Sequence, residues 1–127
     1  MTCVWDALRT KIKREDIRSI LGLSNPSAKE FVMALKGKNC CTTGIKWQGQ
    51  SLSEQQLSEN MKWIENHDAS GINNGYDCSS CDAYLILVAY IFKIKIIHTY
   101  LNSQIIYESS EPPKYTLHFS NNQGHFW

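Results

Sequence analysis

The strongest constraint on the fold is an apolar segment at residues 83–97, which is broken only by lysines at positions 93 and 95. Asp82 can cap a helix that runs to about Phe92, and a helix that is apolar on all sides must be buried. The β-branched residues that follow, at positions 94–98, predict a strand. We therefore expect the helix to be buried by the sheet that contains this strand.

The first half of the chain has helical periodicity. Apolar residues recur at helical spacing in residues 4–12, 28–35 and 57–64. Asn25 and Pro26 before the second segment and Gly37 after it predict a cap, a proline at the first helical position and a glycine past the helix end. Ser53 precedes the third helix. The Gly-, Thr- and Gln-rich segment between the second and third helices, and residues 66–75, are predicted to be irregular.

The second half has the alternation typical of strands. Asn102 and Ser103 predict a turn that makes a hairpin between residues 94–98 and 104–107. Tyr115, Leu117 and Phe119 alternate with polar residues, and after a polar turn at residues 121–124 the chain returns through His125. The sequence therefore predicts a compact α+β fold, with N-terminal helices packed on a small, mostly antiparallel sheet.

Composition limits the classes of function. A chain of 127 residues predicts a single domain, residues 1–127, and we expect a monomer. The net charge is +1 with both signs spread along the chain, so nucleic acid is not an expected partner. No apolar run approaches the roughly 20 residues of a membrane span, and no signal peptide is recognisable. Five cysteines without a secretory leader indicate reduced thiols, so we expect a soluble intracellular protein.

Three blocks resemble ovarian-tumour (OTU) type deubiquitinases, a family of papain-like cysteine proteases. Residues 3–8 read Cys-Val-Trp-Asp-Ala-Leu and are similar to that family's Cys-aliphatic-aromatic-x-Ala-Leu motif. Residues 82–97 resemble its buried helix and following strand. Residues 117–127, with His125 before Phe126, are similar to its terminal strand pair. The short length and the lack of Asp-Gly-Asn before Cys3 fit viral members, and the proteases of nidoviruses such as toroviruses and arteriviruses are the nearest resemblance.

The resemblance implies a papain-like, OTU-like fold and a thiol-dependent hydrolase that cleaves after the C-terminal Gly-Gly of ubiquitin. Ubiquitin-like modifiers are left open as further substrates. By analogy, the domain would act in the cytoplasm of a host cell, antagonise innate immunity and process a viral polyprotein.

The expected chemistry centres on Cys3 and His125. A helix N-terminus and a nearby imidazolium both favour the thiolate form of Cys3, which is the nucleophile. His125 would protonate the leaving amine, and the backbone amides of Thr2 and Cys3 would stabilise the oxyanion. Trp127, with Gly124, would line a narrow slot that admits only Gly-Gly, although the Trp127 ring could equally cover the hydrophobic core.

The residue that orients the histidine is where the chain departs from the family. Many relatives carry Asp or Asn two residues after the histidine, where Trp127 stands, and others carry it upstream of the cysteine, where only Met1 and Thr2 precede Cys3. Asn122, on the turn before His125, is the remaining candidate for the residue that orients the histidine. The alternative is a catalytic dyad.

Other titratable residues have competing interpretations. His118 is the rival base, but strand alternation would expose it on the face opposite Leu117 and Phe119. His98 and His67 are expected to be structural or solvated.

Four further cysteines could bind zinc as a set. They are Cys40, Cys41, Cys78 and Cys81. Four thiolates bind zinc tetrahedrally, but adjacent cysteines are awkward ligands, so packed free thiols and no cofactor are expected. Two other functional classes remain open: a different papain-like hydrolase or acyltransferase, and a non-catalytic binding module with Cys3 in its core.

Overall fold

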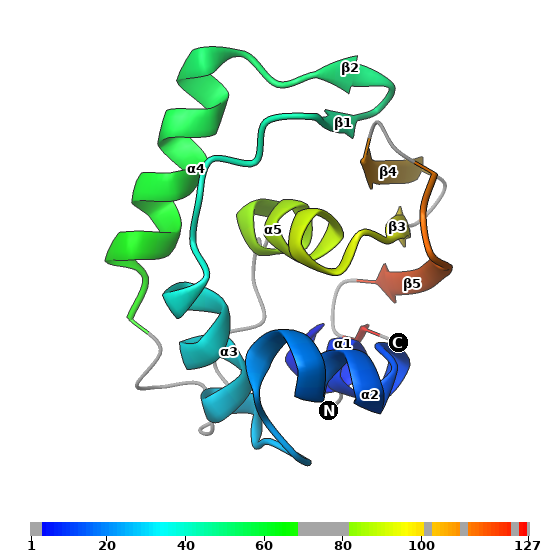
Figure 1. Ribbon diagram of the computed structural model, residues 1–127. Helices are drawn as coiled ribbons and strands as arrows, with labels where there is room; N and C mark the ends of the chain where they lie inside the picture. The colour runs from blue at the N-terminus through cyan, green and yellow to red at the C-terminus, as the bar shows by residue number, and fades with distance from the viewer. Residues whose placement is uncertain (1–3, 69–81, 101–102, 110–111, 123–124, 127) are drawn as a thin grey trace.

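The computed structural model describes residues 4–68, 82–100, 103–109, 112–122 and 125–126. The helices are α1 (Val4–Lys11), α2 (Arg14–Asp16), the π-helical turn η1 (Ile17–Leu21), α3 (Ala28–Gly37), α4 (Glu54–Asn66) and α5 (Asp82–Phe92). The strands are β1 (Ile45–Trp47), β2 (Gln50–Ser51), β3 (Lys95–Tyr100), β4 (Ser103–Ser109), β5 (Thr116–Asn122) and β6 (His125–Phe126). Helices packed with a sheet in this way confirm the predicted α+β class (Figure 1).

The described strands form one sheet in the order β2-β1-β4-β3-β5-β6. Neighbouring strands are antiparallel except β3 and β5, which run parallel, so the expected mostly antiparallel sheet is confirmed. A parallel neighbour requires the chain to return to the start of β3 before β5 begins. There, the Lys114 amide donates to the Lys93 carbonyl at 2.9 Å and the Lys95 amide donates to the Tyr115 carbonyl at 3.1 Å. These two bonds fix where β5 starts beside β3.

Helix α5 is at the centre of the core. Every residue from 83 to 89 is buried, together with Phe92. In Figure 1 the helix lies between α4 and the sheet, and the Tyr107 hydroxyl of β4 donates a hydrogen bond to the Asp82 carboxylate at its first turn. The prediction of an apolar helix buried by the sheet is confirmed, since one side of α5 meets the strands and the other meets α4. In the described part of the chain, no helix combines the length and the apolar character that crossing a membrane requires.

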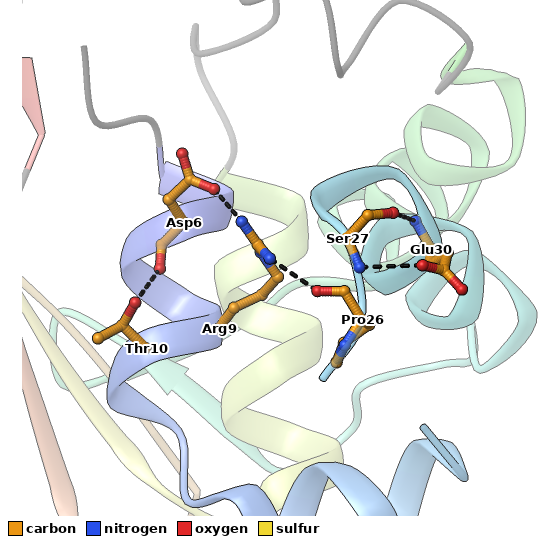
Figure 2. Close-up of polar contacts among 6 residues, drawn as sticks. All are labelled: Asp6, Arg9, Thr10, Pro26, Ser27 and Glu30. Atoms are coloured by element: carbon orange, nitrogen blue, oxygen red, sulfur yellow. Dashed lines mark hydrogen bonds and ion pairs between the residues drawn. The ribbon is translucent and has the colours of Figure 1, made fainter. Parts of the chain in front are cut away.

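Serine side chains begin α3 and α4. Ser53 accepts a hydrogen bond from the Gln56 amide while the Gln56 side chain accepts one from the Ser53 amide, which confirms the predicted start of α4. Helix α3 has the same reciprocal pair between Ser27 and Glu30 (Figure 2). The prediction that Asn25 caps this helix and Pro26 begins it is therefore wrong by two residues, because the cap is Ser27, whose side chain satisfies the free amide.

The segment between α3 and α4 was predicted to be irregular, but the structure shows that it contains the β1–β2 hairpin. Gln48 and Gly49 both have positive φ, 55° and 78°, which suits the two-residue turns that match the twist of a hairpin. The Gln48 side chain adds two bonds to the β4 backbone, donating to the Gln104 carbonyl at 3.0 Å and accepting from the Ile106 amide at 3.1 Å. This pairing with a strand more than 50 residues away, rather than strand propensity, holds the hairpin in the sheet.

Asp16 links the N-terminal helices to the start of β5. Its carboxylate lies 3.0 Å from Lys114 Nζ and accepts a hydrogen bond from Tyr115 Oη at 2.7 Å. Burial by itself raises the pKa of Asp16, but the bonds from Tyr115 and Lys114 outweigh burial and hold the pKa below its usual value. Burial and the Asp16 contact also raise the pKa of Tyr115 to about 12.

Replacing Asp16 with asparagine is expected to lower the free energy of unfolding at neutral pH by about 1–3 kcal/mol, because two donors lose a charged acceptor. A carboxylate with a lowered folded-state pKa contributes stability above its unfolded pKa of about 4, and this contribution is lost as the pH falls through the folded-state pKa. Urea unfolding of both proteins should thus show a gap in unfolding free energy at pH 7 that narrows as the pH falls below about 4. Glu15→Gln, at the exposed neighbouring position, should match wild type at pH 7. A gap that widens on acidification would contradict this assignment.

Candidate active site

The helix that follows Cys3 is firmly packed at its first turn. Helix α1 begins at Val4, and both Val4 and Trp5 are buried, with exposed fractions of 0% and 1%. The Trp5 ring packs edge-on against Tyr84 of α5, with 5.0 Å between ring centroids. Trp5 is thus part of the hydrophobic core. Thr2 and Cys3 lie outside the described residues.

His125 lies in β6 at the edge of the sheet. The backbone register pairs His125 with Asn122 and Phe126 with Asn121. The predicted polar turn at residues 121–124 is therefore shorter than expected, since Asn121 and Asn122 belong to β5. Two other predicted site residues, Gly124 and Trp127, lie outside the described residues.

Helix α1 and strand β5 are in direct contact although they are far apart in sequence. The Lys11 ammonium donates a hydrogen bond to the His118 carbonyl and lies 4.8 Å from the centroid of the Phe119 ring. Partial burial lowers the pKa of Lys11. Just beyond the helix, the Lys13 amide lies 3.4 Å from Tyr115 Oη and the Lys13 ammonium 4.9 Å from the Tyr115 ring. These contacts join the helix that follows Cys3 to the strand that pairs with β6, and Figure 1 shows α1 next to the β5 end of the sheet.

The rival histidine at position 118 is on the outward face of β5. His118 is exposed, whereas Leu117 and Phe119 on either side of it are 6% and 1% exposed. The predicted alternation in this strand is confirmed. His98 is partly buried in β3, at the position that pairs with Phe119.

His67 has a more defined setting than the sequence suggested. It caps the end of α4, its ring stacks on Trp63 with centroids 5.1 Å apart, and its Nδ1 lies 2.9 Å from the Tyr84 hydroxyl. Tyr84 also contacts Trp5, so His67 belongs to an aromatic cluster next to the first turn of α1. The spacing of Trp63 and His67, four residues apart, is the signal that could have indicated this stacked pair.

Two cysteines of the possible zinc set are described. Cys40 is partly buried and Cys41 is exposed, with Cys41 Sγ 3.1 Å from Thr43 Oγ1. Burial and the neighbouring Cys41 raise the pKa of Cys40. Cys78 and Cys81 lie outside the described residues, and the described residues contain no cluster of three or more His, Cys, Asp or Glu side chains that could hold a metal ion.

Comparisons with protein-family models, with curated proteins and with solved structures gave no match.

Proposed function

We propose that this protein is a cysteine peptidase of the papain-like, OTU-like kind, with Cys3 as the nucleophile and His125 as the general acid and base. The observation that carries the proposal is the contact between α1 and β5. Cys3 immediately precedes α1, and His125 is on the strand that pairs with β5. The bond from Lys11 to the His118 carbonyl therefore supports an arrangement in which the two catalytic segments are neighbours.

The lengths of the two elements are compatible with this pairing. An eight-residue helix is about 12 Å long, and the four residue steps from His118 to Asn122 span about 13 Å. With its last turn bonded at His118, α1 has the length needed for its first turn to lie level with β6. The burial of Val4 and Trp5 would hold that first turn in place.

In the proposed reaction, the Cys3 thiolate attacks the carbonyl carbon of the scissile bond. The resulting oxyanion is stabilised by backbone amides at the helix start, including those of Thr2 and Cys3. The imidazolium of His125 gives its proton to the leaving amine, and a water molecule, activated by the neutral imidazole, then releases the acyl group from Cys3. Asn122, which the backbone register sets opposite His125, is our candidate for the residue that orients the imidazole.

We propose ubiquitin as the substrate, with cleavage after its Gly-Gly tail and Trp127 and Gly124 at the slot that admits the tail. Ubiquitin-like modifiers are a further substrate class in this proposal. The support is the motif at residues 3–8 together with the order of the buried helix, its following strand and the histidine strand. The same resemblance supports a viral domain that acts in host cytoplasm, antagonises innate immunity and processes its own polyprotein.

A ubiquitin with an electrophile in place of its C-terminal carboxylate tests the proposed function. Incubation with wild-type protein should give a covalent adduct on a denaturing gel, and Cys3→Ala should give none, because the thiolate is the attacking group. Cys41→Ala is the matched control, since Cys41 is an exposed thiol and its loss should leave the adduct unchanged. An unmodified wild-type protein would reject the deubiquitinase proposal. Cleavage of short peptides or small amides without reaction with ubiquitin would instead favour another papain-like hydrolase.

A further inference from the structure

All three arginines of this chain line one hollow. The other ten basic residues are lysines, and they are spread along the sequence. Arg9 of α1, Arg14 of α2 and Arg18 of η1 surround a space of about 310 Å³, which is closed on its other side by the loop before α3. We call this space the arginine hollow. Because arginine has a planar fork of donors that lysine lacks, its concentration at one place indicates recognition of an oxyanion.

Arg9 is held in position by its neighbours. One terminal nitrogen donates to the Pro26 carbonyl at 2.7 Å, and the other pairs with the Asp6 carboxylate (Figure 2). The Thr10 hydroxyl, in turn, donates to the Asp6 carbonyl at 2.8 Å. Asp6 therefore offsets the charge of Arg9, and the guanidinium connects α1 to the residue just before the cap of α3 and forms one wall of the hollow.

Arg14 and Arg18 carry the charge that is not offset. Both are exposed, and neither is paired with an acidic side chain in the ranges that the structure describes. They are four residues apart on one helical segment, where like charges repel each other. Asp16, between them, is directed to Lys114 and Tyr115 instead. Two guanidinium groups therefore face the hollow without an internal counterion.

The remaining lining of the hollow fits a small molecule with an anionic group. Ser24 and Asn25 add polar side chains, whereas Ile17, Leu23 and Pro26 add apolar surface, and none of the described lining residues is acidic. The volume is at the small end of the range for ligand pockets, about 300–1,000 Å³. Two free cations match a phosphate monoester, which carries a charge of about −2 near neutral pH, better than a carboxylate, which would leave one cation uncompensated.

We propose that the arginine hollow binds the phosphate group of a small soluble molecule, independently of the proposed peptidase activity. Inorganic phosphate and glycerol 3-phosphate are suitable probes, followed by amide proton–nitrogen NMR spectra at constant ionic strength. The expected result is a saturable shift of amides within residues 9–26, with acetate giving a much weaker response. Equal responses to acetate and phosphate would overturn the dianion assignment.

Two variants make this test specific. Arg14→Gln/Arg18→Gln should weaken phosphate binding by at least about tenfold for each charge-assisted bond that is lost. Arg18→Lys, which keeps the charge but loses the fork, should bind less tightly than wild type. The matched control is Lys46→Gln/Lys62→Gln, which removes the same charge from exposed positions outside the hollow and should bind as wild type does.

The outcomes separate this proposal from simple surface charge. The amide spectrum of each unliganded variant reports whether it folds, and Arg18→Lys remains a test if the double variant does not. Equal binding by wild type and the arginine variants would overturn the proposal, as would shifts spread over the lysine-bearing surfaces. Binding to vesicles that contain phosphatidic acid, without binding to glycerol 3-phosphate, would overturn the assignment to a soluble ligand.

Discussion

His125→Ala is expected to reduce the turnover of a fluorogenic ubiquitin C-terminal substrate by about 10³-fold or more, because the thiolate loses its partner and the leaving amine loses its proton donor. The protein should remain folded, since β6 is a two-residue strand at the edge of the sheet. The measurement is kcat/KM from initial rates, with the melting temperature of each variant determined in parallel.

His118→Ala is the matched control for this prediction. His118 is exposed on β5, and it is the backbone carbonyl of this residue, not its ring, that bonds to Lys11. Turnover and melting temperature should both stay near the wild-type values. If His118→Ala abolished turnover and His125→Ala did not, the general base would have to be reassigned to His118.

Trp5→Ala is expected to lower the free energy of unfolding by about 3–5 kcal/mol, because removal of a large buried ring leaves a cavity that its neighbours cannot fill. Trp5 is 1% exposed and packs edge-on against Tyr84 at the point where α1 begins. Urea unfolding at neutral pH measures the loss. Activity should fall as well, since this contact helps to hold the helix that follows Cys3.

Trp63→Ala provides the comparison for Trp5. Trp63 also contacts Tyr84, with 5.7 Å between centroids, but it is 43% exposed. Its removal therefore takes less apolar surface out of the core and should cost clearly less stability. A loss for Trp5→Ala no larger than that for Trp63→Ala would contradict the role of Trp5 as the anchor of α1.

Local sequence patterns were sufficient for the elements that bury one clear face. Residues 83–92 are apolar on every side, and the structure buries residues 83–89 and Phe92 in a helix that lies between α4 and the sheet. Leu117 and Phe119 alternate with His118, and they are buried where it is exposed. In such segments, burial of apolar side chains determines both the type of element and its orientation.

Elements that depend on distant partners could not be predicted in this way. The β1–β2 hairpin is held by bonds from Gln48 to β4, and Asp16 is held by Lys114 and Tyr115 almost 100 residues later. Nothing in the local sequence specifies such contacts. The parallel pairing of β5 with β3 is of the same kind, since it depends on the path of the chain rather than on strand propensity.

The candidate site also has parts that local sequence predicts and parts that depend on distant contacts. The apolar periodicity of residues 4–12 correctly predicts the helix α1, and the alternation near residue 119 predicts the strand that leads to His125. The contact between Lys11 and His118, which joins these two elements, spans 107 positions and has no sequence signature. The arginine hollow has no sequence signature for a related reason, because Arg9, Arg14 and Arg18 line one space only once α1, α2, η1 and the loop before α3 are folded together.

The central claim is that one particular thiol is the nucleophile, and peptide mapping by mass spectrometry tests it most directly. Wild-type protein is incubated with the ubiquitin electrophile and digested, and the cross-linked peptide is identified. Our account predicts that ubiquitin is attached to Cys3 and that His125→Ala slows the attachment. Attachment to Cys40 or Cys41, or an attachment to Cys3 whose rate does not depend on His125, would contradict it.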